Sequence, residues 1–537
     1  MMNTPLTLTG LLNRAERYFS KKEIVSTTLS GVQRFTYGEY GKRTRRLADA
    51  LSKLSMGKGD KVATFAWNTH RHLEAYFAVP CTGAVLHMVN IRLSPEHVAY
   101  VINHAEDKIL LVDEDLVPLI EKVQSELKTV EKYIIMSDKD TLPETTLSPV
   151  YSYEELLKEA DEEFVFPEDL DENTPAGMCY TSATTGNPKG VVYTHRGIVL
   201  HSMATGLADS LALSERDVCM PIVPMFHANA WGLPFASVWF GTKLVLPGPN
   251  MTPQAIASLI QEEKVTLTAG VPTIWLAFIN LLEKENYDIS SLRAVVCGGS
   301  AAPKNIIRAF EEKHNVPFIQ GYGMTETSPL VSLSTLTSEM DNISLEDKVD
   351  TRASQGLVIP GLDVRVINEN GDVPWDGKTM GELIVRGPWV AHEYYKDERT
   401  KDTFRNGWLY TGDIAKLNDS GYIQITDRTK DLIKSGGEWI SSVDLENALM
   451  THDAVYEAAV IAVPHEKWQE RPVACVVLQE GYAESIKDEL VSYLSSQFAK
   501  WWIPDELIFM DEIPKTSVGK FLKRALREKL GQEMTVE

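Results

Sequence analysis

The chain has 537 residues, of which 44% are hydrophobic and 24% are charged, and its formal net charge is −22. A chain of this length usually divides into two or more domains, and this composition is ordinary for a globular enzyme. The negative charge argues against general binding to nucleic acids or to an anionic membrane surface. Anionic substrates would therefore require local clusters of lysine and arginine.

Cysteine usage and hydropathy bear on the compartment of the protein. The five cysteines are odd in number and widely scattered, and no pair has the spacing of metal ligands or of a redox motif. The first residues lack a basic stretch followed by a long apolar one, and no run approaches the roughly 20 apolar residues of a membrane span. These features predict a cytoplasmic protein with no integral membrane segment.

The N-terminal region alternates helical and strand-like patterns. Tyr40–Leu54 has leucines on one helical face, and the short apolar stretch Lys61–Ala66 follows it. Further apolar runs at Ile109–Asp113 and Ile134–Met136 predict two more strands. Alternation of this kind predicts a largely parallel sheet with helices on both faces. The acidic stretch Glu159–Pro175 is predicted to be a linker or a surface loop.

The ten residues Thr181–Gly190 combine hydroxyls, glycines and one lysine between two apolar runs. They predict a strand–loop–strand turn that holds a polyphosphate, because hydroxyl and backbone N–H groups donate to phosphate oxygens and Lys189 adds positive charge. The turn is not the common nucleotide loop, since Pro188 precedes this lysine and a glycine follows it. An ordinary hairpin with a polar tip is the alternative interpretation.

Three further motifs carry chemistry. In Gln320–Thr327 the residue Glu326 replaces the third glycine of a dinucleotide loop, so this carboxylate is better read as a Mg²⁺ ligand near a triphosphate. Tyr410–Asp413 places an aspartate after a turn glycine, where it could accept both ribose hydroxyls. Pro514–Lys520 carries a lysine that could reach an anionic centre from a mobile element. A helix start, a simple turn and a solvated lysine are the respective alternatives.

The segment Asp427–Asp431 carries four charges in five residues and predicts a hinge. The residues after it are numerous enough for a compact α+β domain. We therefore expect an N-terminal domain of residues 1–427 and a mobile C-terminal domain of residues 428–537. The predicted elements of the second domain are two strands and a helix, Val455–Val463, Val473–Leu478 and Ile486–Gln497.

Together, in this order and spacing, these motifs resemble those of the adenylate-forming superfamily, which includes acyl-CoA synthetases, luciferases and peptide-synthetase adenylation domains. The resemblance covers essentially the whole chain. It implies an α/β fold with a large N-terminal region of mixed and parallel sheets and flanking helices, plus a small mobile C-terminal α+β domain. It also implies that a carboxylate attacks the α-phosphate of ATP, giving acyl-AMP, and that a thiol, often that of coenzyme A, then takes the acyl group.

The resemblance assigns roles to residues of this chain. Thr181 and Glu326 would flank Mg²⁺, and Asp413 and Arg428 would hold the ribose hydroxyls. The phosphate grip would involve Ser182, Thr184, Thr185, Gly186 and Lys189. The adenine would be lined by Gly299, Ser300, Ala301, Gln320, Gly321 and Tyr322, with Thr325 next to the metal ligand. The phosphate loop departs from the usual pattern at Ala183, which replaces a glycine and would be strained by roughly 1–2 kcal/mol if its φ is positive.

The C-terminal roles follow in the same way. Lys520 matches the catalytic lysine that bridges the α-phosphate and the substrate carboxylate, and Lys430 matches the pivot of the hinge. Rotation there would withdraw Lys520 after adenylation and bring Lys434, Gly436 and Gly437 to the thioester-forming site.

The segment Pro224–Gly232 resembles that of medium- and long-chain fatty acyl-CoA synthetases. In those enzymes the residue matching Trp231 gates a tunnel for the alkyl chain, and the one matching His227 lies near the acyl carboxylate. On a helix these two side chains would share a face. A tryptophan packed in a core is the alternative interpretation. The residues expected to contact the acyl substrate are His227, Ala228, Trp231, Gly232 and Trp439.

The leading hypothesis is an ATP-dependent, AMP-forming fatty acyl-CoA synthetase, an acid–thiol ligase that uses Mg²⁺ and coenzyme A on a medium- or long-chain acid. The alternatives are a ligase for a short, methylthio-substituted or aryl acid and, in another class, a non-catalytic acyl or nucleotide sensor on the same fold. The resemblance also allows a homodimer, since some fatty acyl relatives pair through their N-terminal regions.

Overall fold

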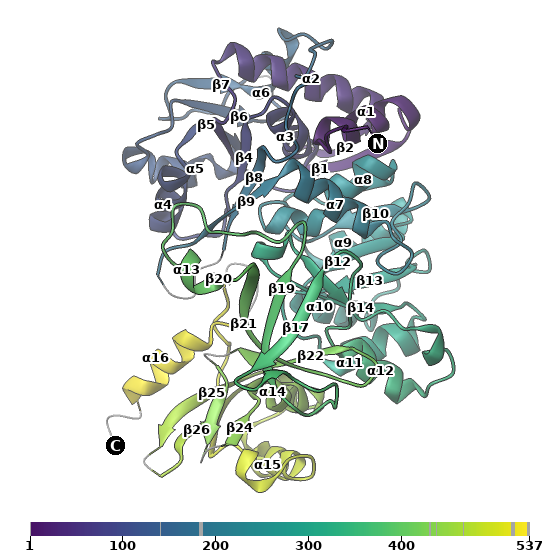
Figure 1. The fold of residues 1–537 in the computed structure, drawn as a ribbon, viewed down its shortest axis with the longest axis vertical. Coiled ribbons are helices and arrows are strands. Elements are labelled where there is room, and N and C mark those ends of the chain that lie inside the picture. Colours follow the sequence, from purple (N-terminus) through teal and green to yellow (C-terminus); the bar gives the residue numbers. More distant parts are fainter. Residues whose placement is uncertain are drawn as a thin grey trace.

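The computed structural model describes residues 2–139, 141–181, 186–428, 431–435, 438–465, 467–516 and 521–533. Four β-sheets with packed helices follow one another along the molecule, from the N-terminal region at the top of Figure 1 to the last hundred residues at the bottom. The predicted fold class is confirmed, because a large region of parallel and mixed sheets precedes a smaller α+β region.

The first sheet has seven strands in the order β7-β6-β5-β3-β4-β8-β9, and every neighbouring pair is parallel except β8–β9. Its strands are β3 (Lys61–Phe65), β4 (Val85–Met88), β5 (Asp107–Asp113), β6 (Lys132–Met136), β7 (Val150–Ser152), β8 (Pro175–Tyr180) and β9 (Gly190–Thr194). The helices of this region are α2 (Tyr37–Lys53), α3 (His70–Cys81), α4 (Pro95–Ala105), α5 (Val117–Glu121) and α6 (Tyr153–Lys158).

The predicted helix and the three predicted strands of this region are confirmed. Helix α2 begins three residues earlier than predicted because Thr36 and Glu39 form a capping box at its N-terminus. The acidic stretch before β8 contains no strand or helix beyond residue 159, as predicted, although Phe166 and Leu170 in it are buried.

The second sheet has nine strands, with a parallel centre and antiparallel edges, in the order β16-β15-β14-β13-β12-β10-β11-β1-β2. Its strands are β1 (Glu23–Thr28), β2 (Gly31–Thr36), β10 (Val218–Pro221), β11 (Lys243–Leu246), β12 (Leu267–Gly270), β13 (Ala294–Cys297), β14 (Phe318–Gly323), β15 (Leu330–Leu333) and β16 (Leu357–Val358). The associated helices are α1 (Leu8–Tyr18), α7 (His195–Thr205), α8 (Leu233–Phe240), α9 (Pro253–Glu263), α10 (Pro272–Leu282), α11 (Lys304–Arg308) and α12 (Leu345–Ala353).

One continuous apolar core joins these two sheets. Helix α3 contacts strands of both sheets, and each of its residues is buried. Its charged side chains Arg71 and Glu74 are paired, as buried charges require: Arg71 lies 2.8 Å from both Asp138 and Glu154, and Glu74 lies 2.6 Å from Arg43.

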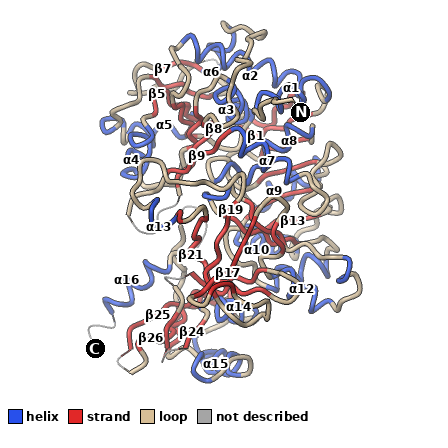
Figure 2. Tube along the Cα trace, viewed as in Figure 1, coloured by secondary structure: helices blue, strands red, loops and turns tan. Residues whose placement is uncertain are grey.

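Two antiparallel or mixed sheets complete the fold, and in Figure 2 the strands of the five-stranded sheet lie at the bottom of the molecule with those of the six-stranded sheet above them. The six-stranded sheet contains β17 (Asp363–Asn368), β18 (Gly371–Asp372), β19 (Gly381–Arg386), β20 (Phe404–Arg405), β21 (Trp408–Leu417) and β22 (Ile423–Arg428), with α13 (Thr400–Thr403) beside it. The five-stranded sheet contains β23 (Ile433–Ser435), β24 (Glu438–Ile440), β25 (Val455–His465), β26 (Gln469–Leu478) and β27 (Glu506–Phe509). Its helices are α14 (Ser442–Thr451), α15 (Lys487–Ser495) and α16 (Lys523–Glu533).

The two strands and the helix predicted after the hinge correspond to β25, β26 and α15. Both faces of the five-stranded sheet carry their own apolar clusters, so this region has a core separate from that of the first two sheets. Within the described ranges, we find no helix with the length and apolar character needed to cross a membrane.

Candidate active site

A cavity of about 960 Å³ lies where β8, β14, β21 and β22 end and where the segment before α16 approaches them. Most of the predicted site residues that the structure describes line it. They are Thr181, Lys189, His227, Ala228, Trp231, Gly299, Ser300, Ala301, Gln320, Gly321, Tyr322, Thr325, Glu326, Asp413 and Arg428.

The predicted strand–loop–strand turn is confirmed, because β8 and β9 are antiparallel neighbours joined by residues 181–189. At its base the Thr181 amide donates to the Lys189 carbonyl at 2.9 Å, and the Lys189 amide donates to the Thr181 hydroxyl oxygen at 3.2 Å. Gly186 has a φ of 69°, a conformation that favours glycine. Ser182, Ala183, Thr184 and Thr185 lie outside the described residues.

The side chain of Lys189 is directed at Glu326. Its ammonium donates to the Tyr394 hydroxyl at 2.7 Å, that hydroxyl donates to Glu326 Oε1 at 2.6 Å, and the lysine and carboxylate are 3.9 Å apart. Burial lowers the pKa of Lys189, although the neighbouring Glu326 opposes that change. Sequence reasoning missed Tyr394, because it stands in a charged stretch with no motif of its own.

Glu326 is suited to Mg²⁺. It lies in the short 3-10 helix Thr325–Thr327, only 4% of it is exposed, and it faces the cavity beside Thr181. Within the described ranges no group of three or more His, Cys, Asp or Glu could hold a metal without other ligands. Mg²⁺ is usually bound through one or two carboxylates together with substrate phosphates, and Glu326 could supply one such carboxylate.

The predicted adenine wall is built by hydrogen bonds between two strand ends. The Gln320 side chain on β14 donates to the Ser300 carbonyl at 3.0 Å and accepts from the Ala302 amide at 2.9 Å. These bonds fix the loop after β13, where Gly299 has a φ of 88°. Gln320 itself is 2% exposed, so its contacts support the loop.

The predicted ribose site contains a carboxylate between two donors. Asp413 is 4% exposed, accepts a hydrogen bond from the Tyr322 hydroxyl at 2.6 Å, and lies 3.2 Å from the Arg428 guanidinium. Asp413 and Arg428 are cross-strand neighbours on β21 and β22, which explains how residues 15 positions apart meet. The proximity of Asp413 raises the pKa of Arg428.

The predicted helical arrangement of His227 and Trp231 is wrong. Residues 228–231 all have φ between 44° and 58°, so the chain makes a left-handed turn that Gly232 continues before α8 begins. A left-handed turn reverses the rotation between successive side chains, and it costs about 1–2 kcal/mol for each non-glycine residue. Such strain, held by surrounding packing, is typical of functional sites. Both side chains nevertheless line the cavity.

Packing at two glycines holds this left-handed turn. A Cβ on Gly298 would lie 2.9 Å from Cη2 of Trp231, so the indole rests against the glycine backbone. Gly232 packs against His201 in the same way, with 2.5 Å from a notional Cβ to the imidazole Cε1. Other apolar residues also line the cavity: Leu211, Leu233, Ala269, Val296, Leu330 and Leu333.

The C-terminal region reaches the cavity through the residues around α16. Lys520 lies outside the described residues, but Thr516 and Phe521 on either side of segment 517–520 line the cavity. Helix α16 is fixed by Lys523, whose ammonium lies 2.7 Å from Glu446 and 2.5 Å from the Ser442 hydroxyl. That hydroxyl donates to Asp427 at 2.6 Å, which joins α16 to the end of β22.

Lys434, predicted for the thioester step, and Trp439, predicted to contact the acyl substrate, lie together in the C-terminal region. Lys434 and Trp439 belong to the hairpin β23–β24, where the Lys434 ammonium lies 4.6 Å from the centroid of the indole ring. Neither is among the described residues that line the cavity. Lys430, Gly436 and Gly437 lie outside the described residues.

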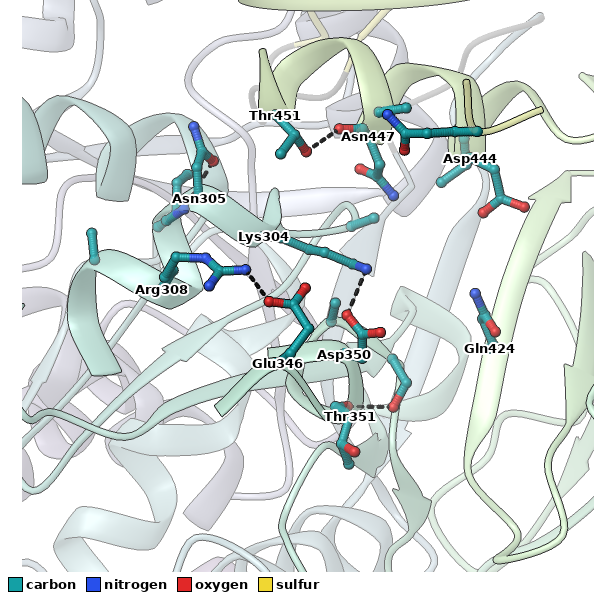
Figure 3. Close-up of a pocket in the computed structure, with 18 of the residues that line it drawn as sticks. Lys304, Asn305, Arg308, Glu346, Asp350, Thr351, Gln424, Asp444, Asn447 and Thr451 are labelled. Carbon is teal, nitrogen blue, oxygen red and sulfur yellow. Dashed lines mark hydrogen bonds and ion pairs between the residues drawn. The ribbon is translucent and has the colours of Figure 1, made fainter. Parts of the chain in front are cut away.

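A second cavity, of about 1040 Å³, lies between helices α11 and α12 and helix α14. Figure 3 shows two basic side chains of its lining paired with carboxylates: Lys304 lies 2.5 Å from Asp350, and Arg308 lies 2.5 Å from Glu346. The predicted residues Lys189, Glu326 and Asp413 line the first cavity, so we expect the nucleotide there.

Comparison with known proteins identifies the family. A model described as AMP-binding enzyme matches residues 12–395, and one described as AMP-binding enzyme C-terminal domain matches residues 444–520. The chain therefore belongs to the AMP-binding enzyme family, and the resemblance derived from the motifs is confirmed.

The relatives include several CoA ligases. A long-chain-fatty-acid–CoA ligase of Thermus thermophilus is 51% identical over 98% of this chain and 96% of its own length. A medium-chain-fatty-acid–CoA ligase of Ectopseudomonas oleovorans is 41% identical, covering 99% and 97%. A 3-methylmercaptopropionyl-CoA ligase of Ruegeria lacuscaerulensis is also 41% identical, covering 100% and 99%. The crystal structure of an anthranilate CoA ligase in complex with anthranoyl-AMP shares the fold, with a TM-score of 0.89, 24% identity and 99% coverage of both chains.

Proposed function

We propose that the chain is an ATP-dependent, AMP-forming fatty acyl-CoA synthetase that acts on medium- or long-chain acids. The observation that carries this proposal is a single cavity with three chemically distinct regions. Lys189 and Glu326 form an ionic end, Asp413 and Arg428 form a hydroxyl-binding wall, and Trp231 stands in an apolar region. The printed activities of the relatives from Thermus and Ectopseudomonas support the same substrate class.

In the proposed first step a carboxylate attacks the α-phosphate of ATP, and pyrophosphate leaves. Charge grows on the phosphate oxygens, so catalysis needs fixed cations and donors at that place. Lys189 and the loop before it would hold the β- and γ-phosphates, Asp413 would accept the ribose hydroxyls, and Lys520 would bridge the α-phosphate and the acyl carboxylate. Thr181 and Glu326 would hold Mg²⁺, which neutralises charge on the phosphates when it is bound.

We further propose a division into two domains, residues 1–427 and 428–537, with a hinge at Lys430. The separate core of the five-stranded sheet supports this division. The side of the C-terminal region that carries Thr516 and Phe521 faces the cavity, as adenylation requires. A rotation about the hinge would replace it by the β23–β24 hairpin with Lys434, Gly436, Gly437 and Trp439, and coenzyme A would then accept the acyl group.

The test is release of pyrophosphate from ATP by the purified chain, measured with octanoate and with palmitate, with and without coenzyme A. We expect acid-dependent release and formation of the acyl-CoA thioester. Pyrophosphate release with no thioester product would instead indicate an acyl-AMP ligase. A chain that binds ATP and acids but turns over none of them would be the non-catalytic sensor.

The alternative substrate is a short, methylthio-substituted acid, which the relative from Ruegeria favours. Trp231 offers a test of the acyl site, because its indole fills space beside Gly298. We expect Trp231→Ala to change the ratio of kcat/KM for palmitate over octanoate by roughly tenfold in favour of palmitate, since a few methylene contacts are worth that much.

The matched control for this variant is Trp375→Ala, which removes an indole that is 59% exposed. It should leave the palmitate-to-octanoate ratio unchanged. An equal loss of activity toward both acids in Trp231→Ala would show that the indole acts in the core rather than in selecting the chain.

We also propose a homodimer and a cytoplasmic location. Strand β2 is an edge of the nine-stranded sheet. Val32 on this strand is 51% exposed, and Leu29 just before it is 60% exposed. An exposed apolar edge strand favours pairing with a second copy of the chain. We expect a dimer mass by light scattering and a monomer for Val32→Lys; a wild-type monomer would refute the homodimer.

The cytoplasmic location is supported by the cysteines. All five are described, and all are buried thiols, which suits a reducing compartment.

A further inference from the structure

The segment Tyr394–Arg399, which we call the clamp segment, contacts the phosphate loop. The contacts lie at residues 187–190, the limb of the loop that leads into β9. The Arg399 guanidinium donates to the carbonyl of Asn187 at 3.1 Å, and the Tyr395 amide donates to the carbonyl of Gly190 at 2.8 Å. These groups come from more than 200 residues further along the chain. The limb is therefore held by hydrogen bonds that its own sequence does not supply.

The clamp segment is itself firmly placed. Arg399 pairs with Asp397 through a bond of 2.8 Å, and the Thr400 hydroxyl accepts from the Tyr394 amide at 3.0 Å. A Cβ on Gly186 would lie 3.9 Å from Nη1 of Arg399, so the guanidinium borders the tip of the loop as well as its limb. Arg399 and Tyr394 both line the cavity.

The Tyr394 hydroxyl occupies the position between the cation and the carboxylate of the ionic end. It accepts from Lys189 and donates to Glu326, and the residue is only 3% exposed. Because the phenol holds only Oε1 of the carboxylate, it orients Glu326 without consuming both of its oxygens.

We propose that the clamp segment is part of the triphosphate site. Tyr394 acts as a positioning residue that orients Glu326 toward Mg²⁺ and Lys189 toward the β- and γ-phosphates, and Arg399 fixes the loop backbone at Asn187. The proposal rests on the proposed use of ATP, but not on the identity of the acid. It predicts that the clamp matters for a nucleotide with a triphosphate and not for one with a single phosphate.

The experiment is calorimetric titration of the full chain with ATP plus Mg²⁺, with ATP plus EDTA, and with AMP. The variants are Tyr394→Phe and Arg399→Gln, and the matched control is Tyr287→Phe, which removes a phenol hydroxyl that donates to Glu285 at 3.1 Å and does not line the cavity. We expect Tyr394→Phe to weaken Mg-ATP binding by roughly tenfold, as loss of a hydrogen bond to a charged group does, with AMP affinity unchanged. Tyr287→Phe should match the wild type with all three ligands.

Arg399→Gln provides a second test of the clamp segment in case Tyr394→Phe does not fold. Circular dichroism shows whether each variant is folded. Arg399→Gln should weaken ATP binding severalfold with and without Mg²⁺, because it acts on the loop rather than on the metal ligand, and should again spare AMP. Equal losses for AMP and Mg-ATP in the folded variants, or no loss in either variant, would overturn the inference. A wild-type chain that binds Mg-ATP but activates no fatty acid would refute the proposed substrate and leave the clamp to be judged by these titrations.

Discussion

Replacing Lys520 with alanine is expected to slow acyl-adenylate formation by about 100- to 1000-fold, the usual cost of losing one preorganised charge or donor at a developing anion. The ammonium would bridge the α-phosphate and the attacking carboxylate, where negative charge accumulates. Thr516 and Phe521, which flank segment 517–520, line the cavity and support an action at this place. The measurement is acid-dependent release of pyrophosphate under single-turnover conditions.

The second half of this prediction concerns the thioester step. When acyl-AMP is supplied with coenzyme A, Lys520→Ala should form the thioester at nearly the wild-type rate, because the hinge has then withdrawn the lysine. The control is Lys515→Ala, since Lys515 pairs with Glu457 at 2.7 Å inside the C-terminal region. That variant should keep both steps within about threefold, in the range of a surface substitution. Equal loss of both steps in Lys520→Ala would contradict the division of labour between two orientations.

Regular elements could be predicted from the sequence because their signals are local. The strand β5 (Asp107–Asp113) is an apolar run, and α2 shows its leucine face directly in the sequence, although its Thr36 cap, before the expected start, was missed. The strand–loop–strand turn at residue 181 could be predicted for the same reason. Each of these depends on residues within about fifteen positions of one another.

The left-handed turn at 228–231 could not be predicted, because its cause is not local. Two alanines and a tryptophan carry no signal for positive φ, and asparagine favours it only as a single residue, so a right-handed helix is the ordinary choice for the run. The turn persists because Trp231 packs on Gly298 and the following Gly232 packs on His201, contacts that cross from one element to another. Tertiary packing therefore decides the backbone at the place where the acyl group is expected.

At the ionic end of the cavity, too, some residues could be predicted from the sequence and one could not. Lys189 and Glu326 could be predicted, because each stands in a recognisable motif. Tyr394 joins them from 68 and 205 residues away and belongs to a stretch whose charges suggest an exposed loop. A single sequence gives no spacing that would connect such residues, so the group that sets the geometry of the site emerged only from the fold.

Glu326→Gln is expected to lower the rate of adenylation by about 100-fold or more, through loss of the charge that binds Mg²⁺. Glutamine has nearly the same shape and can still accept the hydrogen bond that Tyr394 donates at 2.6 Å, so the pocket should keep its geometry. The signature is a shift of the Mg²⁺ titration of pyrophosphate release to higher concentration. Mn²⁺, which is bound more tightly by oxygen and nitrogen ligands, should restore part of the rate.

A buried carboxylate elsewhere serves as the control for this substitution. Glu263 has a side chain that is 5% exposed and pairs with Lys243 at 2.8 Å, far along the sheet from the cavity. Glu263→Gln should lower the melting temperature while leaving the Mg²⁺ titration where it is. An unshifted Mg²⁺ titration in Glu326→Gln, with the rate reduced only in proportion to folded protein, would remove Glu326 from the metal site. The comparison of the two variants distinguishes a carboxylate that binds Mg²⁺ from one whose loss only lowers the stability of the fold.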